Sequence, residues 1–195
     1  MIFDNYDMLK EKGISSTDHS KIASLFIETK EYEKIHQTNL SALLQDYTEA
    51  GFIEQNEQLR KGKGTPFLNE LINKSPPIPN DCIVYRYMLP FEKFPKKGRY
   101  QSYGYLSTTI DISLVKKAVC SGSTTTVQGD FVMMKIHVPK GKHALYIAHL
   151  GEAELLFPHD ITLNVNYKIE EILICSTSEK EYQIGSVTVY DVDMI

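Results

Sequence analysis

The sequence predicts an α+β fold in a single domain, residues 1–195, with a helical N-terminal part (1–80) and a β-rich part (81–195). Apolar residues recur at helical spacing over the first part. The proline-rich segment from Ser75 to Asn80 then stops helix formation. Short runs of β-branched and aromatic residues, separated by turn residues, follow this segment. Helices first and strands afterwards are typical of α+β proteins rather than of alternating βαβ units.

Helical spacing and capping residues support the N-terminal part of this prediction. Ser16-Thr17-Asp18 supplies side-chain oxygens that can cap a first helix. A short helix from Phe67 to Ile72 is expected after the flexible segment Gly62-Lys63-Gly64-Thr65. The positions at helical spacing are Ile22, Leu25, Phe26, Leu40, Leu43, Leu44, Tyr47, Phe52, Ile53, Asn56 and Leu59.

The β-rich part contains seven runs with strand character. One helix, from Ile112 to Cys120, is expected between the second and the third run, and a polar loop from Ser121 to Asp130 follows it. The runs are CIVYRYM (82–88), YGYLSTTI (103–110), DFVMMKIHV (130–138), ALYIAHL (144–150), AELLF (153–157), ITLNVNYKIEEILIC (161–175) and SVTVYDV (186–192).

Charge and motif content exclude several classes of function. The net charge is −4, and the basic runs are no longer than Lys61-Gly62-Lys63 and Lys96-Lys97-Gly98-Arg99, which argues against nucleic acid as a partner. No apolar stretch approaches the roughly 20 residues that span a bilayer, so no membrane partner is expected. The common glycine-rich nucleotide motifs, the zinc-protease motif and the serine nucleophile elbow are absent.

Cysteine, histidine and the N-terminal sequence indicate the compartment and predict no metal site. Cys82, Cys120 and Cys175 form no C-x-x-C pair, and we expect buried thiols in a reducing compartment. His137 and His143 flank a turn, where a solvated or edge position is expected, and they lack metal-ligand spacing. The N-terminal sequence has no cationic start and apolar core of a signal peptide. We therefore expect a cytoplasmic protein, or one delivered into a host or target cell without a cleaved signal peptide.

Paired glutamates are the first candidate for chemistry. The Glu-x-Glu pairs are Glu31/Glu33, Glu179/Glu181 and Glu152/Glu154. The first lies on a predicted helix, where residues two apart point about 200° from each other. The second lies in a polar turn and is interpreted as solvated charge. The third leads into the strand AELLF, where a period of two puts both carboxylates on one face. Exposure at the start of a strand would explain that pair alone, so its surroundings must decide.

Two strands upstream supply those surroundings. Arg86 lies in the apolar run from Cys82 to Tyr87, where a permanently charged guanidinium needs an anionic partner such as a nucleotide diphosphate. Ser107, Thr108 and Thr109 place three consecutive hydroxyl residues in the next run, although β propensity alone also explains them.

In this order, the Arg86 strand, the Ser-Thr-Thr strand and the Glu-x-Glu pair resemble the R-S-E signature of the arginine-specific mono-ADP-ribosyltransferases, a family of bacterial toxins, effectors and phage enzymes. YTEAGFIEQNEQLRKG (47–62) is similar to a helical segment of that family, and FVMMKIHVPKG (131–141) to the strand and turn before its glutamates. The resemblance implies two roughly perpendicular, mainly antiparallel β-sheets with NAD bound in the cleft between them. Two departures are Ser-Thr-Thr in place of Ser-Thr-Ser, and Tyr87 where a glycine is frequent.

The resemblance also implies roles for individual residues. Arg86 would hold the pyrophosphate of NAD, and Ser107 would lie near the nicotinamide ribose and orient Glu154. Glu154 would bind the ribose 2′-hydroxyl and stabilise the positive charge that develops on the sugar. Glu152 would hold and deprotonate the acceptor arginine. The remaining residues expected to bind NAD are Tyr87, Gly104, Tyr105 and Thr108, with Thr109 supporting the strand.

The function implied is transfer of ADP-ribose from NAD to an arginine of a target protein, with release of nicotinamide and no metal. The partners are thus NAD and a protein with an accessible arginine. Two alternatives stay open on sequence grounds. An NAD glycohydrolase, in which water replaces arginine, would use the same residues. A degenerate transferase fold could act as a binding module.

Overall fold

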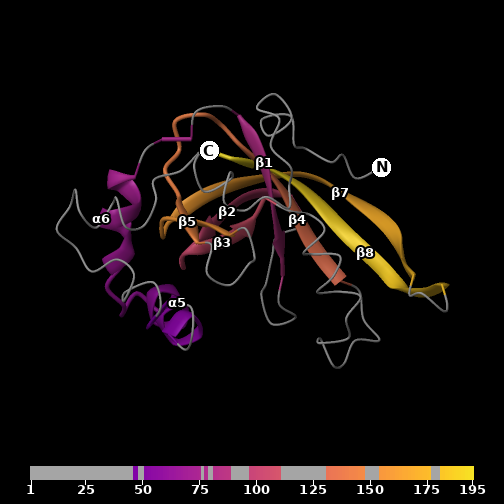
Figure 1. The fold of residues 1–195 in the computed structure, drawn as a ribbon, viewed down its shortest axis with the longest axis horizontal. Helices are drawn as coiled ribbons and strands as arrows, with labels where there is room; N and C mark the ends of the chain where they lie inside the picture. Colours follow the sequence, from indigo (N-terminus) through magenta and orange to yellow (C-terminus); the bar gives the residue numbers. More distant parts are fainter. Residues whose placement is uncertain are drawn as a thin grey trace.

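The structure, a computed structural model, describes residues 46–47, 51–75, 77–78, 81–88, 97–110, 131–147, 154–176 and 181–195. Within them two helices precede the strands in the chain, as the sequence predicts (Figure 1). The helices predicted before residue 46 and at 112–120 lie outside the described residues, as does the loop from Ser121 to Asp130. The elements are α5 (Phe52–Arg60), α6 (Phe67–Lys74), β1 (Cys82–Tyr87), β2 (Gly98–Ser102), β3 (Leu106–Thr109), β4 (Phe131–Val138), β5 (Leu145–Ile147), β6 (Glu154–Phe157), β7 (Ile161–Ser176) and β8 (Glu181–Met194).

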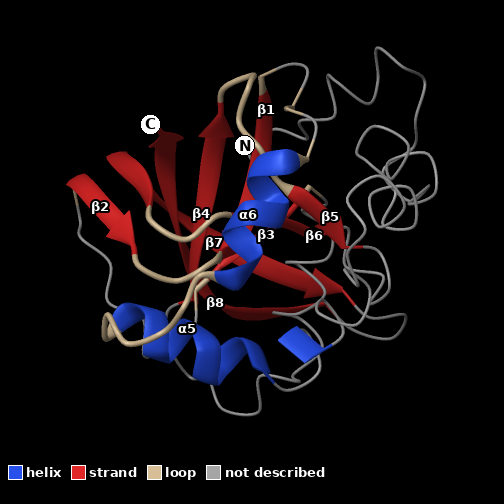
Figure 2. Ribbon diagram, turned by 90° about the vertical axis from the view of Figure 1, so that its left-hand side faces the viewer, coloured by secondary structure: helices blue, strands red, loops and turns tan. Residues whose placement is uncertain are grey.

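The described strands join in a mixed eight-stranded sheet with the order β2-β7-β8-β4-β1-β3-β6-β5. Two antiparallel groups make up this order, β2-β7-β8 and β4-β1-β3-β6-β5, and the parallel pair of β4 with β8 connects them. Figure 2 shows that strand direction changes across the sheet, with β1 and β4 steep and β5 and β6 oblique. The α+β prediction with mainly antiparallel strands is thus confirmed, and the β4–β8 pair joins the two expected groups of strands into one continuous sheet.

β2 is a strand that the sequence pattern did not reveal. It lies at one edge of the sheet and pairs only with β7 among the described strands. Its sequence, GRYQS, is polar, and Arg99 is exposed. An edge strand buries little apolar surface, so it lacks the alternation that identifies a strand in a sequence.

The sheet separates two hydrophobic cores, and β6 lies between them. Leu155 and Phe157 point into the larger core, whereas Leu156 points into the smaller one. All four residues of β6 are buried, so this strand is covered on both faces. The larger core contains Ile78, Val84, Met88, Leu106, Ile110, Met134, Ile136, Val138, Ala144, Tyr146, Leu155, Phe157, Leu163, Val165, Tyr190, Val192 and Met194. The smaller core contains Tyr47, Leu59, Leu68, Leu71, Ile72, Tyr105, Leu145, Ile147 and Leu156.

Helices α5 and α6 cover the smaller core. Figure 1 shows them together at one end of the molecule, beside β5 and away from the tip of the long β7–β8 hairpin. Helix α6 buries Leu68, Leu71 and Ile72. Helix α5 forms where the spacing predicts it, but two of its apolar residues do not face the core: Phe52 is 39% and Ile53 58% exposed. The pattern predicts this helix correctly and misassigns part of its buried face, because its first turn lies beyond the core that Asn56 and Leu59 enter.

The structure describes His137 and Cys82, two of the residues for which the sequence predicts a degree of burial. His137 is partly exposed on the sheet, and its Nε2 lies 2.8 Å from Asp191 Oδ1. Cys82 is partly buried against the larger core, and this burial, with the charge of Asp81, raises the pKa of its thiol to about 12. Cys120 and the side chain of Cys175 lie outside the description. None of the described helices is long and apolar enough to cross a membrane.

Truncating the centre of the larger core should destabilise the protein strongly. Phe157 is completely buried, so Phe157→Ala is expected to lower the free energy of unfolding by about 3–5 kcal/mol. Ile195→Ala truncates an apolar side chain that is 52% exposed, and its effect should stay within about 0.5 kcal/mol. Urea unfolding of both variants measures the difference. Equal effects of the two changes would contradict this description of the core.

Candidate active site

Three neighbouring strands carry the three residues of the predicted signature. Arg86 lies on β1, Ser107 on β3 and Glu154 on β6, and the sheet order places β3 directly between the other two. Tyr85 pairs with Thr109 across β1 and β3, and Thr109 pairs with Glu154 across β3 and β6. Residues 21 and 47 positions apart in the chain are therefore brought together by strand pairing.

The Ser107 side chain is hydrogen-bonded to Glu154. Its hydroxyl donates to Glu154 Oε1. The glutamate is only 7% exposed, and a buried carboxylate needs such donors to offset the loss of its hydration. Glu154 shares its face of β6 with Leu156, which points into the smaller core. Its carboxylate therefore lies on the helix-covered side of the sheet rather than in open water.

The same serine also contacts Arg86 through its backbone. Arg86 Nη1 donates to the Ser107 carbonyl oxygen at 2.8 Å, in a partly buried position. The guanidinium is rigid and planar, so one such bond restricts the directions of its other donors. Ser107 consequently binds the arginine through its main chain and the glutamate through its side chain.

Thr108 faces away from this group. Consecutive strand residues point to opposite faces, and the Thr108 hydroxyl donates to the Leu155 carbonyl at 2.8 Å. The side chain is 4% exposed and ties β3 to β6. We therefore interpret Thr108 as a residue that supports the strand pair that carries Ser107 and Glu154.

A buried asparagine joins α5 to the segment before β3. Asn56 Oδ1 accepts a hydrogen bond from the Tyr105 backbone N–H at 2.7 Å, and Asn56 Nδ2 donates to the Tyr47 hydroxyl at 3.0 Å. A Cβ at Gly104 would lie 2.7 Å from Asn56 Oδ1, so only glycine permits this approach. Gly104 and Tyr105, which were predicted to line the nicotinamide pocket, hold the helix in this structure.

Tyr105 extends the connection to α6. Its hydroxyl accepts a hydrogen bond from the Leu68 N–H at 2.8 Å. Burial raises the pKa of Tyr105 to about 12, although hydrogen bonds with the backbone of Leu68 and Asn69 act in the opposite direction. Its ring also makes edge contacts with Tyr47 and Phe67. The residue that precedes β3 is thus fixed by both helices.

Tyr47 lies near the charges of the site, and the sequence prediction missed it. Burial raises the pKa of the Tyr47 phenol, and the hydrogen bond from Asn56 lowers it. The charge of Glu154 also raises this pKa, whereas the charge of Arg86 lowers it. Both charged groups therefore lie within electrostatic range of this hydroxyl. Asn56 was the sequence signal that could have led to Tyr47, because a polar residue at an apolar position of a helix needs buried hydrogen-bond partners.

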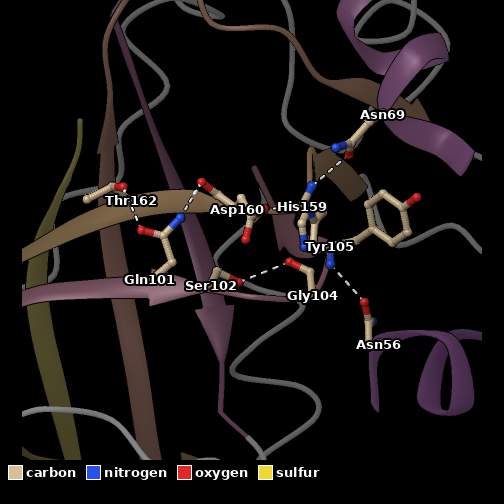
Figure 3. A network of polar contacts seen from close by, with 9 residues as sticks. All are labelled: Asn56, Asn69, Gln101, Ser102, Gly104, Tyr105, His159, Asp160 and Thr162. Atoms are coloured by element: carbon tan, nitrogen blue, oxygen red, sulfur yellow. Dashed lines mark hydrogen bonds and ion pairs between the residues drawn. The ribbon is translucent and has the colours of Figure 1, made fainter. Parts of the chain in front are cut away.

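A second polar network fixes the far end of β6 (Figure 3). The His159 backbone N–H donates to Asn69 Oδ1 of α6 at 2.9 Å. Gln101 Nε2 donates to the Asp160 carbonyl at 2.7 Å, and the Asp160 N–H donates to the Ser102 carbonyl at 2.9 Å. Asp160 has a φ of 67°, a left-handed conformation that aspartate tolerates better than most residues. These bonds anchor the turn after β6 to both α6 and β2.

Two other predicted residues have different outcomes. Tyr87 is partly buried at the end of β1, and burial raises the pKa of its phenol. Glu152 and the loop before it lie outside the described residues. Within the described ranges, no group of three histidine, cysteine or acidic residues could hold a metal ion.

The Gly104–Asn56 contact predicts a coupled pair of substitutions. Gly104→Ala should destabilise the fold by about 1–3 kcal/mol, because the new methyl group would overlap the Asn56 amide. Asn56→Ala removes the two closest atoms, so Gly104→Ala should cost less in that background. Urea unfolding of the two single variants and the double variant measures the coupling. Strictly additive effects would show that the two residues are not in contact.

Comparisons with solved structures show that this fold is shared with known proteins. C2-I, the enzymatic component of the C2 toxin from Clostridium botulinum, superposes with a TM-score of 0.62 at 14% identity, over 93% of this chain and 48% of that one. BECa, from a binary enterotoxin of C. perfringens and solved with NADH, gives 0.57 at 14% identity, over 97% and 48%. The chain therefore spans about half the length of each. C3larvin, an ADP-ribosyltransferase from Paenibacillus larvae, gives 0.51 at 20% identity, over 87% and 95%.

At these identities the structural neighbours show a shared fold. No curated protein matches the sequence. The family model described as ADP-ribosyltransferase exoenzyme matches residues 26–190, which include both helices and all three strands of the site. Members of this family use NAD as the donor of ADP-ribose. The chain therefore belongs to the ADP-ribosyltransferase exoenzyme family.

Proposed function

We propose that this chain transfers ADP-ribose from NAD to an arginine side chain of a target protein and releases nicotinamide. The observation that carries the proposal is the hydrogen bond from Ser107 to Glu154, next to a guanidinium bound to the same serine. Family membership supports the ADP-ribose transfer. The choice of arginine rests on Glu152 in the sequence. The proposed catalytic unit is a single domain, residues 1–195, and a family match that covers both its helical and its β-rich part supports this.

Arg86 is proposed to bind the pyrophosphate of NAD. A guanidinium forms paired, charge-assisted hydrogen bonds with phosphate oxygens. The bond from Nη1 to the Ser107 carbonyl supports this role, because it fixes the orientation of the planar group. Tyr47 lies within range of the Arg86 and Glu154 charges, so the NAD site is proposed to lie on the face covered by α5.

Glu154 is proposed to act on the sugar. Cleavage of the bond between ribose and nicotinamide passes through an oxocarbenium-like state, as in glycoside hydrolysis. A carboxylate held beside the ribose stabilises the positive charge that develops. The Ser107 bond supports this role, since it fixes the Glu154 carboxylate before the reaction begins and little reorganisation is then required.

Glu152 is proposed to select the acceptor. An arginine side chain is protonated at neutral pH, with a pKa above about 12, and its nitrogen attacks only as a base removes a proton. A glutamate two residues before Glu154 supplies that base, whereas a glutamine could not. Water as the acceptor would instead give an NAD glycohydrolase.

The proposed setting is the cytoplasm of the producing cell or of a target cell. The names of the structural neighbours, which are toxins, support action in a target cell. The acceptor is proposed to be a protein with an exposed arginine.

Replacing Glu154 by glutamine should abolish both transfer and NAD hydrolysis. Glu154→Gln keeps the shape of the side chain but removes its charge, and we expect kcat to fall at least about 10²–10³-fold. Labelled NAD with agmatine and with cell lysate measures transfer, and nicotinamide release measures both reactions. Glu70→Gln, an exposed glutamate of α6, serves as the control and should keep full activity. Undiminished labelling by Glu154→Gln would refute the proposed mechanism.

Replacing Glu152 by glutamine should separate the two reactions. Glu152→Gln is expected to lose transfer to agmatine while it retains nicotinamide release, because only the acceptor base is removed. Hydroxylamine should release the wild-type adducts, as expected for an arginine linkage. If the wild type releases nicotinamide but labels no acceptor, the protein is a glycohydrolase. If calorimetry shows no heat with millimolar NAD, the chain is a binding module.

A further inference from the structure

The complete sequence contains few residues that an arginine-specific transferase could modify in its own chain. Only three of its 21 basic residues are arginines: Arg60, Arg86 and Arg99. The structure describes all three.

Arg86 cannot serve as an acceptor. It is partly buried on β1, and its Nη1 donates to the Ser107 carbonyl within the proposed NAD site. An acceptor guanidinium must leave its own surface and enter the cleft of an enzyme molecule. Moving Arg86 in this way would break the site on which the reaction depends.

Arg60 is exposed at the C-terminal end of α5. It lies in the last turn of α5, where the free carbonyl groups of the helix favour a positive charge. The pKa of Glu57, one turn earlier, is lowered chiefly by its hydrogen bond and ion pair with Lys61 and to a smaller extent by the charge of Arg60. Both features oppose the loss of a proton, which a guanidinium must undergo to attack the ribose.

Arg99 differs from the other two in position and in surroundings. It is exposed on β2, the strand at one edge of the sheet. Its partner in the strand register is the neutral amide Asn164 of β7, and it follows Lys96, Lys97 and Gly98 in the chain. No ion pair with Arg99 is found in the described part of the chain.

We propose that Arg99 is a self-modification site, at which one molecule of this protein transfers ADP-ribose to another. This proposal rests on the arginine specificity proposed above. The donor is NAD, and the acceptor is the exposed guanidinium on the edge strand of a second copy.

The strand order favours a reaction between molecules over one within a single chain. β2 lies at one end of the order and β6 close to the other, with β7, β8, β4, β1 and β3 between them. Figure 2 shows β2 on the opposite side of the sheet from β5 and β6. Arg99 therefore lies on a strand that five others separate from the strand of Glu154.

The transfer balances without any additional reactant. The bond between C1 of the nicotinamide ribose and the pyridinium nitrogen breaks, and its electron pair goes to that nitrogen, so nicotinamide leaves uncharged. A guanidinium nitrogen of Arg99 forms a new bond to the same carbon. The proton that this nitrogen loses passes to the proposed base, Glu152 of the enzyme molecule, and then to water.

Purified protein with labelled NAD and no other acceptor tests the inference. Wild-type protein should label itself, and a tryptic peptide that contains Arg99 should carry the mass of one ADP-ribose. Arg99→Lys keeps the positive charge but should lose self-labelling, while its transfer to agmatine stays at the wild-type rate. Arg60→Lys is the matched control and should self-label like the wild type.

A mixing experiment tests the intermolecular step. A ¹⁵N-labelled Glu154→Gln chain, inactive but with Arg99 intact, should be modified when active Arg99→Lys protein is added. The same acceptor with Arg99→Lys as well should remain unmodified.

The possible failures are distinguishable. If agmatine is not modified by the wild type, the proposed function is wrong. If agmatine is modified while self-labelling is absent or is unchanged in Arg99→Lys, the function stands and the Arg99 inference is wrong.

Discussion

Ser107 joins the two charged residues of the site. Its hydroxyl donates to Glu154 and its carbonyl accepts from Arg86, so one residue of β3 sets the distance between a cation and an anion carried by two other strands. Both charges are at least partly removed from water, and each would be costly to bury without such bonds. The strands that carry them are therefore useful only when β3 lies between them in the observed register.

The position of β3 depends in turn on two helices that carry none of the three signature residues. Asn56 of α5 and Leu68 of α6 both hydrogen-bond to Tyr105, directly before the strand. At the same end of the β3–β6 pair, Asn69 of α6 binds the backbone of His159, just after β6. The smaller core is thus more than a source of hydrophobic stability, because its polar contacts determine where the site strands begin and end.

Those features of the site that depend on local sequence pattern and residue chemistry could be predicted from the sequence. A charged residue in an apolar run identified Arg86, and the alternation of β6 separated Glu154 from the other paired glutamates. Contacts between distant segments left no such signal. Asn56 hydrogen-bonds to Tyr105, which lies 49 residues further along the chain. No sequence periodicity indicates that position 104 must be glycine so that the Asn56 side chain can fit beside it. β2 was not predicted because it lies at the edge of the sheet and its polar residues resemble those of a loop. The exposure of Phe52 and Ile53 was not predicted because it depends on where the core ends.

The parallel pair of β4 and β8 has a consequence for the order in which this protein folds. Phe131 pairs with Val187 and His137 with Asp193, so the pair joins segments more than fifty residues apart in the chain. Each antiparallel group can pair strands within itself, but only this ladder unites the two groups. Pairings of similar span also occur inside the groups, such as Cys82 with Val138 and Gly98 with Val165. Topologies of such high contact order fold slowly. β8 is the last of the described strands in the chain, so the two groups can join only after the site strands β1, β3 and β6 have been synthesised.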